Sequence, residues 1–203
     1  MNKPQALIQT ILIIFSVAAS LIKFTPFIIG QHLNFSLADT YAPVLGVPAV
    51  IIVSVSSLFL HHVFNLASIL HIFPVIFGAW YFASRKKLVN VVPLVAIIGF
   101  IIHPVGRQVW YYSLFWLVHV IASFYKDRSA LANALGATFT AHAVGGLLWI
   151  YAFNPPASVW NSLIPIVIME RAIFTVSTAA VYVMVQKIIN YSNAIPAHQN
   201  PSV

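Results

Sequence analysis

Seven apolar runs follow one another along the chain and constrain its fold more than any other feature of the sequence. Each has about the length that a membrane-spanning helix requires, roughly 20 residues. The runs cover approximately 6–29, 43–61, 66–83, 88–103, 109–125, 130–153 and 159–187. Proline, glycine, asparagine and clusters of charge separate them. The pattern predicts an all-α fold, a polytopic bundle of transmembrane helices with six spans favoured and seven possible.

Composition supports lipid as the solvent of this bundle. Hydrophobic residues make up 61% of the 203 residues and charged residues 6%, whereas soluble domains carry about 25% charged residues. The apolar runs leave no room for a soluble domain. We therefore expect one transmembrane domain over residues 1–189, followed by a polar, disordered tail over 190–203.

The net charge of +7 reflects topology rather than a nucleic-acid-binding face, because the basic residues sit in short clusters between apolar runs. The triplet at 85–87, Lys126 with Arg128, and Lys187 would mark the cytoplasmic side, which makes the C-terminus cytoplasmic. The uncertainty between six and seven spans lies within residues 1–83, where we expect 31–41 to be external. The predicted location is the plasma membrane of a prokaryote, and nucleic acid is not an expected partner.

Glu170 and Arg171 lie near the middle of the last apolar run. An ionisable residue at that depth costs about 2.5–3.5 kcal/mol on insertion scales, so both should face the bundle interior. Adjacent helical residues point about 100° apart, and each is therefore expected to find its partner elsewhere. Counting from the loop at 154–158 places His142 of the preceding run at the same depth, as a candidate partner for Glu170.

Polar residues flank these three positions at helical spacing. Thr138, His142 and Trp149 share one face of the sixth run, and Arg171 and Thr175 begin a polar stripe on the seventh. Two polar faces at one depth predict a substrate or ion pocket. The alternative is a structural clamp that holds the two helices in register.

A second group of candidate residues lies at a membrane boundary, in the turn that begins at residue 103. Arg107 would bind an anionic group at the pocket mouth, and Trp110 would stack on a flat ligand. The ordinary alternative is an interfacial aromatic anchor.

The eight histidines lack the spacing of a metal site, and we expect neither a metal nor another cofactor. The sequence also lacks nucleotide-binding and nucleophile motifs. Two further readings stay open. One is an intramembrane enzyme or haem-binding redox protein that uses histidines with Glu170, and the other is a structural subunit whose small-residue stripes dock a partner.

Three stretches resemble the substrate-binding S-components of energy-coupling factor transporters. Residues 35–39 are similar to the loop that closes over ligand in that family, residues 73–79 to its middle helices, and 141–146 with Glu170 and Arg171 to its C-terminal pair. The resemblance implies a bundle that captures a vitamin or related micronutrient, with Asp39 near the ligand. It also implies that a transmembrane coupling subunit and ATPases are separate chains.

The leading expectation is therefore a solute-binding transport protein of the membrane. Arg107 and Arg171 outnumber the one acidic residue placed inside the membrane. This excess favours a ligand that bears a carboxylate.

Overall fold

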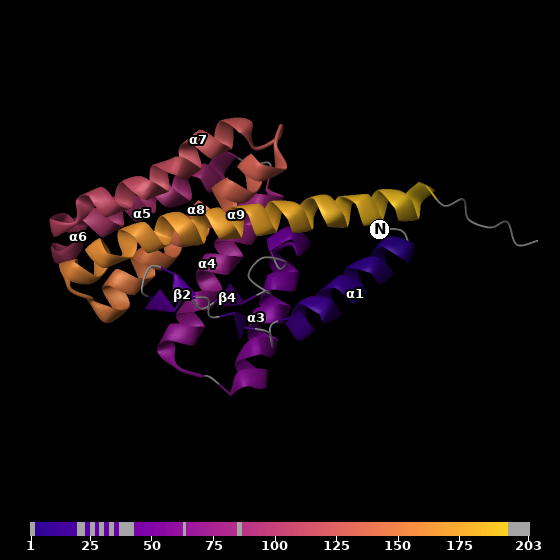
Figure 1. Ribbon diagram of the computed structural model, residues 1–203, viewed down its shortest axis with the longest axis horizontal. Coiled ribbons are helices and arrows are strands. Elements are labelled where there is room, and N and C mark those ends of the chain that lie inside the picture. The colour runs from indigo at the N-terminus through magenta and orange to yellow at the C-terminus, as the bar shows by residue number, and fades with distance from the viewer. Residues whose placement is uncertain are drawn as a thin grey trace, which may run out of the picture.

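The structure is a computed structural model, which describes residues 3–19, 23–24, 27–28, 31–32, 35–36, 43–62, 64–84 and 87–194. Asp39 and the end of the predicted tail, 195–203, lie outside the described residues. Helices dominate the described part (Figure 1). The main helices are α1 (Lys3–Ala19), α3 (Val47–His61), α4 (Leu66–Ala83), α5 (Val91–Ile102), α7 (Val118–Tyr125), α8 (Ala130–Phe153) and α9 (Ala157–Ala194).

Shorter elements complete the bundle. The 3₁₀ helix η1 (Lys87–Asn90) leads into α5, and α6 (Pro104–Gln108) is followed by the 3₁₀ helix η2 (Trp110–Leu117), which leads into α7. Four two-residue strands lie between α1 and α3, where no strand was expected. They are β1 (Lys23–Phe24), β2 (Phe27–Ile28), β3 (Gln31–His32) and β4 (Phe35–Ser36), paired antiparallel as β1 with β4 and β2 with β3.

Three of the described helices are long and apolar enough to cross a membrane. They are α4, α8 and the part of α9 from Ala157 to Tyr191. The segments Val47–His61 and Leu88–Ile102 are apolar but shorter. Large apolar side chains on the outside, such as Phe124 at 75% exposure and Val176 at 61%, fit contact with lipid tails. These features indicate a helical membrane protein.

The helix ends follow from local chemistry. Asn65 and Ser129 cap the N-termini of α4 and α8, since their side-chain oxygens accept from the amides of Ser68 and Ala132. Asn154 ends α8 in the left-handed conformation with φ of 45°. By contrast, α9 continues to Ala194, past the predicted domain boundary at residue 189.

Helix α8 occupies the centre of the bundle and packs against α4, α5, α7 and α9. Small residues permit this close packing. A Cβ added at Gly136 would lie 2.2 Å from the Tyr81 hydroxyl of α4, and one at Gly146 would lie 2.6 Å from the Trp116 ring of η2. The small residues of α8 therefore serve internal packing here.

A cluster of aromatic rings forms the largest part of the core at one end of the bundle. The Phe100 ring lies 5.2 Å from that of Trp116 and 5.0 Å from that of Trp160, both edge to face. Tyr112 contacts Trp160 at 4.9 Å. These rings fix α5, η2 and the start of α9 against α8.

In Figure 1, α5, α6, α7, α8 and the first half of α9 lie together on one side of the view. Helices α3 and α4 run away from this layer, and α1 lies beside the second half of α9, which it contacts. The candidate site lies where α3, α4, α8 and α9 meet.

Candidate solute-binding cavity

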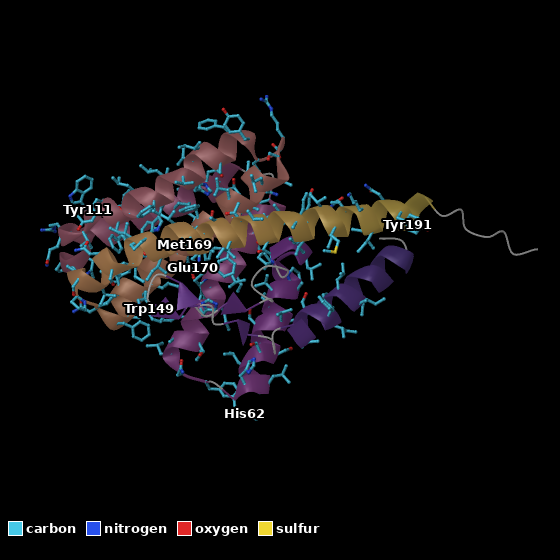
Figure 2. The ribbon with its side chains drawn as sticks, in the orientation of Figure 1. His62, Tyr111, Trp149, Met169, Glu170 and Tyr191 are labelled. Carbon is cyan, nitrogen blue, oxygen red and sulfur yellow. The ribbon has the colours of Figure 1, made fainter. Side chains whose placement is uncertain are left out.

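A cavity of about 860 Å³ lies among α3, α4, α8 and α9. Its volume falls within the range of about 300–1,000 Å³ that is typical of ligand sites. Five of the predicted site residues line it. They are Thr138, His142, Trp149, Glu170 and Arg171. Glu170 lies between the end of the bundle marked by Tyr111 and the end marked by Tyr191, nearer to Tyr111 (Figure 2).

Arg171 and Glu170 pair with each other, which corrects the expectation that each would find its partner elsewhere. Nη2 of Arg171 lies 2.9 Å from Oε2 of Glu170. Both side chains are long, and their rotamers bring the charged ends together across the 100° that separates their Cα–Cβ bonds. Pairing at this depth avoids an uncompensated charge in a medium without water.

Of the remaining contacts of Arg171, one joins α9 to α8 and the other lies within α9. Nη1 donates to the backbone oxygen of Thr138 at 3.1 Å, and the guanidinium lies 4.9 Å from the centre of the Phe174 ring. The Arg171 side chain is 13% exposed. These contacts fit the alternative of a structural clamp, in which the Arg171 side chain also orients Glu170.

Thr175 belongs to the same clamp and does not line the cavity. Its hydroxyl donates to the backbone oxygen of Arg171 at 2.6 Å and lies 3.2 Å from the hydroxyl of Thr138. Thr175 is 4% exposed. Both threonines were predicted to contact ligand, and of the two the structure places only Thr138 at the cavity wall.

Glu170 is the more accessible member of the ion pair, with its side chain 27% exposed. In the part of the chain that the structure describes, Arg171 is its one bonded partner. A carboxylate offers about four acceptor positions. The Glu170 carboxylate therefore keeps unused acceptor capacity toward the cavity.

His142 also lines the cavity, but its hydrogen-bond partner is Tyr112 rather than Glu170. The His142 Nε2 and the Tyr112 hydroxyl lie 3.4 Å apart, and the rings are 5.8 Å apart. Tyr112 is 1% exposed and Trp160 is 2% exposed, and both reach the cavity wall. The sequence reading missed these two rings. The signal for Tyr112 was present in the aromatic cluster that starts at Trp110, but the direction in which Tyr112 faces depends on the 3₁₀ geometry of η2.

Arg107 and Trp110 do not line the cavity, contrary to the prediction of an anion-binding mouth. Arg107 is exposed on the short helix α6, and Trp110 is 50% exposed. The neighbouring Tyr111 donates to Oδ1 of Asn161 at 2.5 Å. This region has the exposed Trp and Tyr side chains of an interfacial belt.

A polar vestibule at the α3–α4 end of the cavity was not predicted. Ser54, Ser57 and His61 recur on one face of α3, and Ser68 and His71 do so on α4. The spacing of three and four residues between these polar side chains was the sequence signal that could have predicted this polar face.

The described residues give little support for a metal site or for a second site at the buried His119. No group of three or more His, Asp or Glu side chains among them could hold a metal ion. The buried His119 bonds to the Thr140 hydroxyl at 2.8 Å, outside the cavity. Comparison of the chain with models of protein families, with characterised proteins and with solved structures finds no match.

Proposed function

We propose that the protein is a membrane solute-binding component that takes a small molecule from outside into the cavity among α3, α4, α8 and α9. One observation carries the proposal: the cavity of about 860 Å³ contains an accessible carboxylate, Glu170, held in place by Arg171. Ligand sites in helical bundles take this form, with a few placed polar groups in a largely apolar pocket.

A structural clamp alone explains fewer of the observed features than a solute-binding site does. Arg171, Thr138 and Thr175 suffice to join α8 to α9. A clamp needs no cavity, and protein interiors are close-packed unless function requires space. The accessible carboxylate and the polar vestibule lie beyond what helix pairing demands.

The transport role extends this proposal to the whole protein. Six spans, a cytoplasmic C-terminus and a location in the prokaryotic plasma membrane are supported by the positions of the basic clusters. The resemblance to S-components supports an uptake role for a vitamin or related micronutrient. On that reading the energy comes from a separate coupling subunit and ATPases, since the sequence contains no nucleotide-binding motif.

Two matched substitutions on α9 test the binding role. Leu163 lines the cavity two turns before Glu170, whereas Ile168 is 55% exposed on the outside. The purified wild-type protein, L163W and I168W would be incubated with a cellular metabolite extract, washed and denatured. Mass spectrometry would then identify the released molecules.

We expect wild type and I168W to release the same non-lipid small molecule and L163W to release little of it. Thermal unfolding would show that each variant is folded. Equal release from L163W and wild type would place the molecule elsewhere. Release of lipid alone by every form would contradict a solute-binding role.

A further inference from the structure

The two formal charges at the cavity wall cancel. Among the described residues that line it, Glu170 and Arg171 carry formal charge, and they form an ion pair at 2.9 Å. A ligand with a net charge would enter a space of low dielectric constant without a free counter-charge. Burial of an unpaired charge is strongly unfavourable.

Both terminal nitrogens of the Arg171 guanidinium have partners, and its Nε is buried without one among the described residues. Nη1 donates to the Thr138 carbonyl, Nη2 lies against the Glu170 carboxylate, and the guanidinium lies over the Phe174 ring. An anionic ligand at Arg171 would approach the negative charge of Glu170, which lies 2.9 Å from the guanidinium and already neutralises it. This arrangement disfavours the carboxylate-bearing ligand that the sequence suggested.

Glu170 presents the opposite chemistry, because an ionised carboxylate only accepts hydrogen bonds. Its side chain is twice as exposed as that of Arg171, at 27% against 13%. The two oxygens of a carboxylate match a pair of parallel N–H donors, in the geometry by which acidic side chains accept from amino groups of bases.

Aromatic rings line the same cavity as this acceptor. Tyr112, His142, Trp160 and Phe174 all line the cavity, and the Tyr112 and Trp160 rings meet edge to face at 4.9 Å. Such rings bury flat surfaces well and favour stacked or edge-on partners.

Given that the cavity binds a solute, we propose that the solute is a flat heterocycle without net charge that donates N–H groups to the Glu170 carboxylate. Arg171 then acts as a positioning residue that neutralises and orients Glu170. Ring stacking against the aromatic wall supplies the apolar part of the recognition.

Probe pairs that differ in charge test this ligand class. Three such pairs are nicotinamide and nicotinate, uracil and orotate, and guanosine and guanosine 5′-monophosphate. Binding of each to the full chain in lipid nanodiscs would be measured at pH 8, where imidazole is ordinarily neutral.

We expect the uncharged member of at least one pair to bind, with its anionic partner at least about tenfold weaker. Preferential binding of an anion overturns the ligand class and leaves the binding role standing. If no probe binds, the molecule that the wild-type protein releases after incubation with the metabolite extract tests the ligand class instead. A net charge on that molecule overturns the proposal of an uncharged ligand. Absence of any ligand in both experiments removes the binding role and the ligand class together.

Glu170→Gln tests the contact itself, with Asp127→Asn as the matched control. Asp127 is exposed in the turn between α7 and α8 and does not line the cavity, so its amide variant makes the same change in charge. E170Q should bind the uncharged ligand at least about tenfold more weakly. It should bind the anionic partner more tightly than wild type does, because Arg171 is no longer neutralised.

D127N should bind both members of the pair as wild type does. An unchanged affinity of E170Q for the uncharged ligand would overturn the proposed contact. If E170Q does not fold, E170D keeps the charge and withdraws the carboxylate by one methylene, and the same loss of affinity for the uncharged ligand is expected. Unchanged affinity of E170D would then overturn the contact.

Discussion

Replacement of Arg171 by methionine removes the charge of the clamp and keeps an unbranched, flexible side chain. The variant loses the charge-assisted bond from Nη1 to the Thr138 oxygen at 3.1 Å, which contributes about 2 kcal/mol. It also leaves Glu170 without its partner at 2.9 Å. Because Glu170 is 27% exposed, we add only about 1 kcal/mol for that loss. R171M should therefore lower the free energy of unfolding by about 3 kcal/mol.

A double-mutant cycle separates these two contributions. E170Q should cost about 1 kcal/mol, because the amide oxygen can still accept from Arg171. The double variant R171M/E170Q carries no uncompensated charge and should be more stable than the single effects imply, by about 1–2 kcal/mol. Arg128 is exposed in the turn before α8, and R128M serves as the control, expected within about 0.5 kcal/mol of wild type.

The assay is unfolding in mixed detergent micelles, followed by the fluorescence of the five tryptophans. Unfolding free energies would be compared for all five proteins. An R171M variant as stable as R128M would refute the clamp. Additive effects in the cycle would refute the coupling between Glu170 and Arg171.

Three further predictions concern packing, capping and topology. Gly136→Ala should destabilise the protein in thermal unfolding, because the overpacking cost of about 1–3 kcal/mol against the Tyr81 ring exceeds the gain in helix propensity of about 1 kcal/mol; equal stability would contradict the close packing of α4 on α8. Ser129→Ala should cost about 1 kcal/mol through loss of the α8 N-cap, and an unchanged midpoint would argue against that cap. The chain has no cysteine, so a cysteine at Asn154 should react with an impermeant maleimide in intact cells and one at Arg128 only after permeabilisation; the reverse pattern would invert the topology.

Helix positions in the chain were largely predictable from its apolar runs. The runs at 66–83 and 130–153 match the bounds of α4 and α8, because asparagine, serine and proline mark those ends. The end of α9 was missed, since the polar residues after 189 continue the helix without an apolar signal. The strands before α3 gave no pattern of two-residue alternation long enough to read.

The candidate site was predictable in position and less so in its contacts. Depth counting along two antiparallel helices brought His142, Glu170 and Arg171 to one cavity. The partner of each residue depends on rotamers and on neighbouring elements, which spacing does not encode. Glu170 thus bonds to the adjacent Arg171, and His142 faces Tyr112, which the 3₁₀ helix η2 turns inward.

The most direct test of a solute site at Glu170 is an experimental structure of the full chain, purified in lipid nanodiscs without denaturation from cells grown in rich medium. The account predicts a bound small molecule in the cavity among α3, α4, α8 and α9, with a donor at hydrogen-bond distance, about 3 Å, from the Glu170 carboxylate. A cavity filled by lipid acyl chains, or closed by direct packing of α4 on α9, would contradict it.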